Sequence, residues 1–194
     1  MTHRSKTLSL VAAGLMVAAP AAVRASDPPW IGEARAVATS VPPKLLSVLQ
    51  EEIAKGGPQS AIAVCKDEAP RLAQAASKET GWTVRRVSLR QRNPKAVPDA
   101  WERATLEDFD RRAAAGEKPP TLERAETVPD ASGRPVMRYM RALPVVDLCT
   151  QCHGTPDRLS AAVQERLKAL YPDDQATGYS VGQIRGAMTI SKPQ

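Results

Sequence analysis

Two thiols and one imidazole lie within five consecutive residues in the last quarter of the chain. Cys149 and Cys152 are three positions apart, and His153 follows directly. Side chains three positions apart lie on one side of a helical turn, so both thiols could bond to neighbouring vinyl groups of a porphyrin. The imidazole would then lie beneath the iron. This spacing predicts one covalently attached haem c with His153 as the proximal ligand.

Two other chemistries use paired thiols, and neither suits this sequence. A dithiol redox motif usually accompanies a strand-helix-strand pattern, which is not found around Cys149. A zinc site of this kind needs a second pair of ligands, which the sequence does not offer. The covalent haem is therefore the preferred interpretation.

The N-terminus has the features of an export signal. Arg4 and Lys6 precede an apolar stretch over residues 8–19, and small residues follow up to Ala25. An uncleaved membrane anchor is the alternative, but the stretch is shorter than the roughly 20 residues that a spanning helix needs. We expect a cleaved signal peptide over residues 1–25 and one domain over 26–194. That domain is expected in the periplasm, with membrane contact only before cleavage.

The formal net charge of +6 raises the question of a nucleic-acid partner. The predicted signal carries three basic residues and no acidic one, so its removal leaves a net charge of +3. The remaining basic residues are interspersed with acidic ones instead of forming a basic patch. We therefore expect no nucleic-acid partner.

The second axial ligand of the iron is less constrained than the first. The other histidine, His3, lies in the predicted signal, which excludes two histidine ligands within one mature molecule. Exported chains usually pair their thiols, yet Cys65 is left over once the other two cysteines hold haem. A buried, inert thiol is the alternative role for Cys65. The candidate ligands are Cys65, Met137, Met140, Met188 and a lysine, or the site is open.

Hydrophobic periodicity predicts four helices and four strands in a mixed order. Asp99 and Glu102 form a capping-box pair for the third helix, whereas Pro70 should kink or divide the second. Alternate apolar residues from Ile184 to Ile190 predict one buried face for the last strand. The helices are expected over 32–55, 62–76, 99–116 and 159–170, and the strands over 82–90, 121–128, 134–146 and 182–190. This order predicts an α+β fold with an antiparallel sheet and flanking helices.

Several stretches of the chain together resemble one known family. They are residues 61–70 (AIAVCKDEAP), 81–94 with Ser88, Leu89, Arg90 and Asn93, 99–102, and an ending with Tyr171, Pro172, Asp173, Ala176, Gly178, Tyr179 and Gly186. These stretches are similar to the PAS-like monohaem c-type cytochromes with histidine and cysteine axial ligands, a family often catalogued as a domain of unknown function. The likeness covers nearly all of residues 26–194.

This resemblance implies a PAS-like antiparallel sheet flanked by helices. It also implies that the cysteine of the Cys-x-x-x-Ala-Pro segment, here Cys65, is the second axial ligand of the iron. Members of the family occur alone in the periplasm or thylakoid lumen, and also as extracytoplasmic modules of signalling proteins.

Haem propionates need cationic partners, and four arginines lie near the haem motif in sequence or in strands expected to flank it. Arg141, eight residues before Cys149, is the preferred candidate for this contact. A solvated strand face is the alternative role for each of the four. They are Arg134, Arg138, Arg141 and Arg185.

Three classes of function remain for such a haem domain. An electron-transfer protein needs a stable haem and a redox protein as partner. A redox- or gas-sensing module needs an axial ligand that changes state and a signalling partner. A haem peroxidase needs an open site and usually a distal histidine as proton shuttle, which the mature chain lacks. We therefore expect a protein that is not an enzyme.

Overall fold

Two long helices form the N-terminal part of the fold in the computed structural model, which describes residues 27–194. Helix α1 (Pro29–Gly56) and helix α2 (Pro58–Thr80) are joined at Gly57, whose φ of 78° favours glycine. Of the two effects expected of Pro70, the division of α2 is wrong, because the helix runs through this residue without a break. The predicted signal peptide over residues 1–25 lies outside the described residues.

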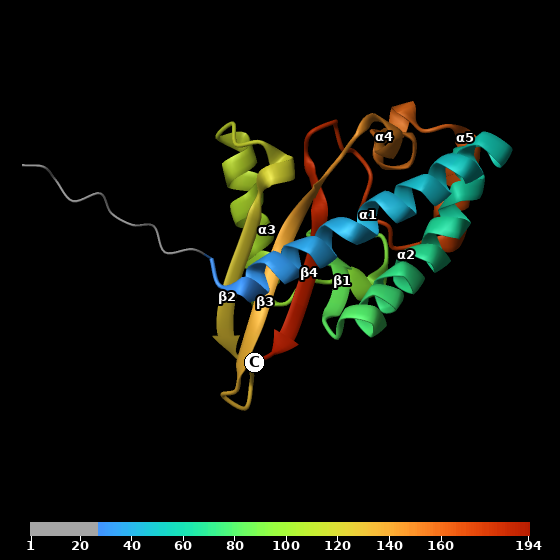
Figure 1. The fold of residues 1–194 in the computed structure, drawn as a ribbon. Helices are drawn as coiled ribbons and strands as arrows, with labels where there is room; N and C mark the ends of the chain where they lie inside the picture. Colours follow the sequence, from blue (N-terminus) through green and yellow to red (C-terminus); the bar gives the residue numbers. More distant parts are fainter. Residues whose placement is uncertain (1–26) are drawn as a thin grey trace, which may run out of the picture.

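A four-stranded antiparallel sheet forms the centre of the molecule (Figure 1). Its strand order is β1-β4-β3-β2, so the C-terminal strand lies between the first and third strands. This arrangement confirms the expected α+β class and the predicted hairpin of the second and third strands. The strands are β1 (Thr83–Val87), β2 (Glu123–Pro129), β3 (Pro135–Pro144) and β4 (Ile184–Pro193).

Three shorter helices complete the fold. Helix α3 (Ala100–Ala114) begins with the predicted capping box, in which Asp99 and Glu102 each accept from the other's backbone N–H. Helices α4 (Asp147–His153) and α5 (Ala161–Leu170) follow β3 along the chain. None of the helices in residues 27–194 has the length and apolar character needed to span a membrane.

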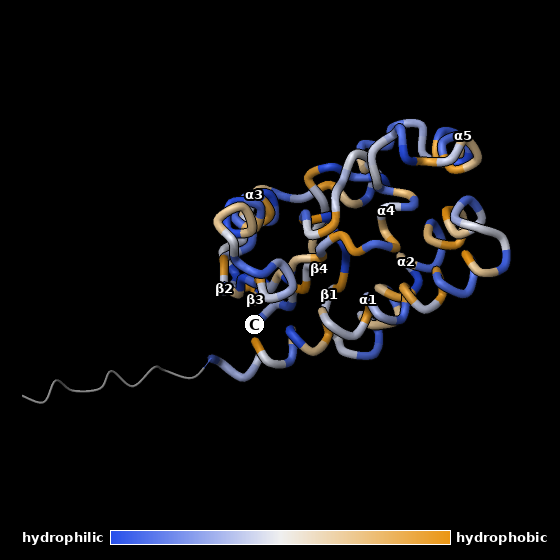
Figure 2. Tube along the Cα trace, turned by 90° about the horizontal axis from the view of Figure 1, so that it is seen from above, coloured by the Kyte–Doolittle hydropathy of each residue, from blue (hydrophilic) through white to orange (hydrophobic). Residues whose placement is uncertain are grey.

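Helices cover both faces of the sheet (Figure 2). One core cluster joins α1 and α2 to Tyr139, Met188 and Ile190. The other lies against α3 and contains Phe109 and Met140. Strand β4 is therefore buried on both faces over most of its length.

The predicted single buried face of β4 is wrong. Met188 and Ile190 face the α1 side of the sheet, whereas Ile184 packs in the cluster on the α3 side. Helices cover both faces of the sheet, so all residues from Ile184 to Ile190 are buried. Ile184 lies on the other face from Met188 because the pairing shifts between Leu143 and Pro144, which leaves Arg185 of β4 without a pairing partner on β3. An irregularity of this kind reverses which face successive residues occupy, and periodicity in one strand does not reveal it.

Gly186 lies beside this irregularity and allows a close approach of two strands. Its φ is 151°, and a Cβ atom placed there would lie 2.3 Å from the carbonyl oxygen of Val87. No other residue type fits without movement of β1 against β4. The glycine therefore permits close strand pairing at the end of the sheet nearest α4.

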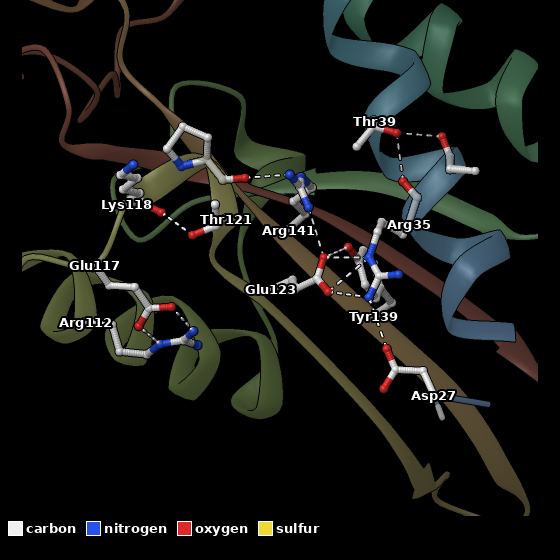
Figure 3. Close-up of polar contacts among 12 residues, drawn as sticks. Asp27, Arg35, Thr39, Arg112, Glu117, Lys118, Thr121, Glu123, Tyr139 and Arg141 are labelled. Atoms are coloured by element: carbon white, nitrogen blue, oxygen red, sulfur yellow. Dashed lines mark hydrogen bonds and ion pairs between the residues drawn. The ribbon is translucent and has the colours of Figure 1, made fainter. Parts of the chain in front are cut away.

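Glu123 on β2 connects the N-terminal helix to the sheet (Figure 3). Its carboxylate accepts hydrogen bonds from the Arg35 guanidinium of α1 at 2.5 and 3.0 Å and from the Tyr139 hydroxyl at 2.5 Å. The Arg141 guanidinium donates at 2.9 Å. The hydrogen bond from Arg35 is the largest influence that lowers the pKa of Glu123.

We expect Glu123→Gln to lower the free energy of unfolding by about 1–2 kcal/mol at neutral pH, because Arg35 and Arg141 lose their anionic partner. The folded-state pKa of Glu123 is depressed, so its contribution is present above its unfolded pKa and is lost as pH falls through the folded value. Urea unfolding of both proteins at a series of pH values measures this difference. Glu79→Gln, at an exposed site on α2, is the matched control.

Candidate functional site

The predicted haem motif forms helix α4, which begins three residues after β3 ends. Val145 continues the strand pairing, because its N–H donates to the Gln183 carbonyl (2.8 Å) and its carbonyl accepts from Gly182 N–H (2.9 Å). The motif is therefore held at the end of the sheet, between β3 and α5 (Figure 1). This position brings α4 close to α2.

Gly154 ends α4 immediately after His153. A Cβ atom at this position would lie 2.5 Å from the carbonyl oxygen of Thr150, so the turn requires glycine. The carbonyl oxygens of His153 and Gly154 accept from the N–H groups of Tyr179 (2.9 Å) and Gly178 (2.7 Å). The helix end is thereby tied to the loop over residues 171–183, which precedes β4.

The two cysteines of α4 contact different clusters. Cys149 packs against Val145, Ala176 and Tyr179. Cys152 packs against the cluster that joins α2 to α5, and its Sγ lies 3.8 Å from the Pro58 carbonyl oxygen. Burial raises the pKa of the Cys152 thiol to about 11, so the thiol is protonated at neutral pH.

The orientation of His153 is fixed by one backbone carbonyl. Its Nδ1 lies 2.6 Å from the carbonyl oxygen of Ala176. A carbonyl oxygen only accepts, so Nδ1 carries the proton and Nε2 keeps a free lone pair. Burial lowers the pKa of His153 well below its usual value, and the charges of Arg185 and Arg92 lower it further. The ring is thus neutral and presents one nitrogen for a metal.

Two arginines bind the loop over residues 171–183, and one of them, Arg92, also binds the motif. Arg92 donates to the Cys152 carbonyl (2.6 Å) and pairs with Asp174 at 2.9 Å, with both side chains at most 10% exposed. Asp174 in turn accepts from the N–H of Ala176 (2.8 Å). Arg90 donates to the carbonyls of Gln175 and Thr177 in the same loop. These bonds position the carbonyl that orients His153.

Arg185 at the start of β4 is the third arginine of this region. Its Nε lies 3.3 Å from His153 Nδ1, and its Nη1 donates to the Ser88 hydroxyl (2.8 Å) and the Arg90 carbonyl (3.1 Å). Burial and the charge of Arg86 lower the pKa of Arg185 to about 9, which leaves it a cation at neutral pH. The site is therefore strongly cationic.

Cys65 lies on α2 and is half-buried. Ile62, one helical turn earlier, packs in the same cluster as Cys152 and Tyr171. Burial is the main cause that raises the pKa of Tyr171, to about 12, and Cys65 lies close enough to both Tyr171 and Cys152 to act on their titration. The fold thus brings Cys65 into the neighbourhood of the motif, across 84 positions of sequence from Cys149.

The three candidate methionines lie elsewhere. Met188 belongs to the core cluster on the α1 side of the sheet, and Met137 packs against it. Met140 is fully buried on the α3 side. The clusters around the motif cysteines contain none of them.

The structure places three of the four candidate arginines away from His153. Arg141, the preferred one, pairs with Glu123 and donates to the Pro120 carbonyl at 2.6 Å (Figure 3). Arg134 pairs with Asp130, and Arg138 pairs with the capping residues of α3. Only Arg185 of the four reaches the histidine.

Residues 27–194 contain no cluster of three or more acidic, cysteine or histidine side chains that would suit a metal ion held by side chains alone. One imidazole with two thiols on the same short helix is instead the donor set that covalent haem requires. The unused Nε2 of His153 and the excess of guanidinium charge beside it also suit a metalloporphyrin that carries two carboxylates.

Comparison with known proteins gives the family of this chain. A family model described as "Tll0287-like: Tll0287" matches residues 12–193. The chain belongs to the Tll0287-like family. No curated protein matches. Among solved structures the chain is similar to one described as the crystal structure of the cyanobacterial heme-protein Tll0287. The TM-score is 0.63 and the identity 25%, and the match covers 87% of this chain and 98% of that one.

Sequence reasoning on this Tll0287-like chain missed three parts of the site: the Ala176 carbonyl, Arg92 and the ring of Tyr179. Tyr179 packs edge-on against His153, with the ring centroids 6.5 Å apart. Ala176 and Tyr179 belong to the C-terminal stretch that resembles the family. Such a resemblance does not show which group a backbone carbonyl contacts. Asp174, four residues after a predicted helix end, gave no signal of a buried ion pair.

We expect Asp174→Asn to lower the free energy of unfolding by roughly 3–5 kcal/mol, because it leaves the buried Arg92 cation without its anionic partner. Urea unfolding at neutral pH measures the loss. Asp173→Asn changes an exposed neighbour and should shift stability by less than about 0.5 kcal/mol. Equal effects of the two substitutions would show that the Arg92 pair does not hold this loop.

Proposed function

We propose that this chain is a periplasmic monohaem c-type cytochrome that acts in electron transfer or redox sensing. In this proposal Cys149 and Cys152 attach the haem, and His153 and Cys65 are the axial ligands. The contact between His153 Nδ1 and the Ala176 carbonyl carries the proposal, because it leaves Nε2 unprotonated. A metal-bound histidine normally donates its other N–H in this way.

The solved relative supports a haem group. That protein is described as a heme-protein from a cyanobacterium, and it matches 87% of this chain at 25% identity. When bound, haem supplies a one-electron couple between ferric and ferrous iron. The roles of individual residues in this chain rest on its own contacts, which place both thiols and the imidazole on one helix.

The cellular location, the domain boundaries and the type of partner are part of the same proposal. Residues 1–25 act as the export signal, which delivers the chain to the compartment where c-type haem is attached. Residues 26–194 form one PAS-like domain, for which the antiparallel sheet and flanking helices are the support. We propose no catalytic residue and no nucleic-acid partner. The partner is a redox protein or a signalling protein.

Cys65 is favoured as the second axial ligand by its position. Its helix contacts the cluster that holds Cys152, whereas Met137, Met140 and Met188 pack in the two cores beside the sheet. A thiolate cancels the net positive charge of a ferric porphyrin and so favours the oxidised state. We therefore expect a low reduction potential, since a methionine ligand has the opposite effect.

Ferric electron paramagnetic resonance tests this ligand. The wild-type protein should show a low-spin thiolate spectrum, and Cys65→Ala should lose it because the sulfur is removed. Met140→Leu and Met188→Leu are matched controls that remove other sulfur atoms and should leave the spectrum unchanged. An unaltered spectrum in Cys65→Ala would assign the position to another ligand.

Sensing is the second candidate function, and the position of Cys65 in α2 favours it. Pro70 lies five residues after Cys65, and its ring cannot donate the usual helical hydrogen bond to Lys66. A thiolate binds ferrous iron less strongly than ferric iron, so reduction would loosen Cys65 on a helix that already lacks one bond. Such a helix could switch between two states.

Carbon monoxide separates these two functions. Electron transfer needs a ligand set that persists, so we expect the visible spectrum of the reduced protein to be unchanged under carbon monoxide. Rapid formation of a carbon monoxide complex would instead support sensing through release of Cys65. Cys65→Ala is the positive control, because its open position should bind the gas in either case. Peroxide turnover by the wild-type protein would contradict our proposal that the chain is not an enzyme.

A further inference from the structure

Arg185 presents a buried positive charge behind the proposed proximal ligand. Its Nε lies 3.3 Å from Nδ1 of His153, on the side of the ring away from Nε2. The residue is only 5% exposed. The hydroxyl of Ser88 and the carbonyl of Arg90 both accept from Nη1, and these bonds fix the guanidinium in place.

The charge of Arg185 has no acidic partner among residues 27–194. The neighbouring Arg92 is neutralised by Asp174 at 2.9 Å, but Arg185 forms no ion pair and instead faces the ring of Tyr179 at 5.5 Å. Buried cations are usually paired, because removal from water is costly. An unpaired cation at this position is therefore retained at an energetic cost.

The contact between Arg185 and His153 is not a hydrogen bond. The proton on Nδ1 is directed to the Ala176 carbonyl, so this nitrogen has no lone pair left to accept from Nε–H of Arg185. Two N–H groups thus face each other. Arg185 acts on the ring through its charge, and it opposes any additional positive charge on the imidazole or on a metal bound to Nε2.

We propose that Arg185 raises the reduction potential of the haem held by His153 and thereby offsets part of the effect of the Cys65 thiolate. This inference rests on the proposed function. In the redox step a one-electron donor protein gives one electron to ferric iron, and no bond forms or breaks. The ferrous state carries one positive charge less, so the fixed cation favours it over the ferric state.

Removal of the charge tests the inference in the haem-loaded protein. At a fixed solution potential, Arg185→Gln should lower the ratio of reduced to oxidised protein at least about tenfold, which corresponds to 59 mV for a one-electron couple. Arg185→Lys keeps the charge, so its ratio of reduced to oxidised protein should stay closer to that of the wild type. This comparison is made at mildly acidic pH, where a lysine holds its proton. Spectroelectrochemical titration gives these ratios.

Arg103→Gln is the matched control for loss of one positive charge. Arg103 is exposed on α3, on the opposite side of the sheet from α1 and α2, and its removal should change the ratio by less than about twofold. An equal shift in Arg185→Gln and Arg185→Lys would show that packing rather than charge matters. An unchanged ratio in Arg185→Gln would also overturn the inference.

A second variant keeps the test decisive if Arg185→Gln does not take up haem. Arg86 on β1 also contributes positive charge at His153, and it is only half-buried. Arg86→Gln should lower the ratio in the same direction by a smaller factor, and no change there would contradict the inference. Absence of any haem spectrum in the wild-type protein would instead refute the proposed function itself.

Discussion

A hydrogen bond from one imidazole nitrogen to one backbone carbonyl sets the chemistry of this site. The bond between His153 Nδ1 and Ala176 fixes which nitrogen is protonated, and it leaves Nε2 with a lone pair that could bind a metal. The carbonyl itself lies in a loop with no regular secondary structure, so it needs outside support. Three sets of hydrogen bonds hold this loop in place: those of Arg92, those of Arg90, and the strand-like pairing of Val145.

The charged groups around this hydrogen bond carry an excess of positive charge. Arg86, Arg92 and Arg185 all act on His153, whereas Asp174 is the one acidic group that pairs directly with any of them in the described residues. Burial is the main cause that keeps the imidazole neutral, and the charge of these arginines adds to it. This charge also provides a setting that suits anionic groups such as a thiolate and haem propionates. The same arginines thus favour a metal-binding imidazole and attract the anionic groups that would surround it.

The regular elements of the fold were largely predictable, because they depend on local sequence. The capping box at Asp99 and the glycines after α1 and α2 mark helix ends, and the structure places those ends within a few residues of the prediction. The faces of β4 were not predictable, since a register shift at Leu143 exchanges them. The partner of Arg141 was missed for a similar reason. Glu123 lies opposite it on the neighbouring strand, 18 positions away in sequence.

The sequence by itself determined the donor set of this protein: two thiols and an imidazole on one helical turn, followed by a glycine that the turn requires. These features are local, and their spacing fixes their geometry. Only the tertiary structure decided what surrounds them. In the folded chain Cys65 on α2 lies near the motif, and the three candidate methionines pack in the cores beside the sheet. Arg185, and not Arg141, is the arginine that lies beside the histidine. Such contacts depend on strand register and on backbone carbonyls, which no side-chain pattern encodes.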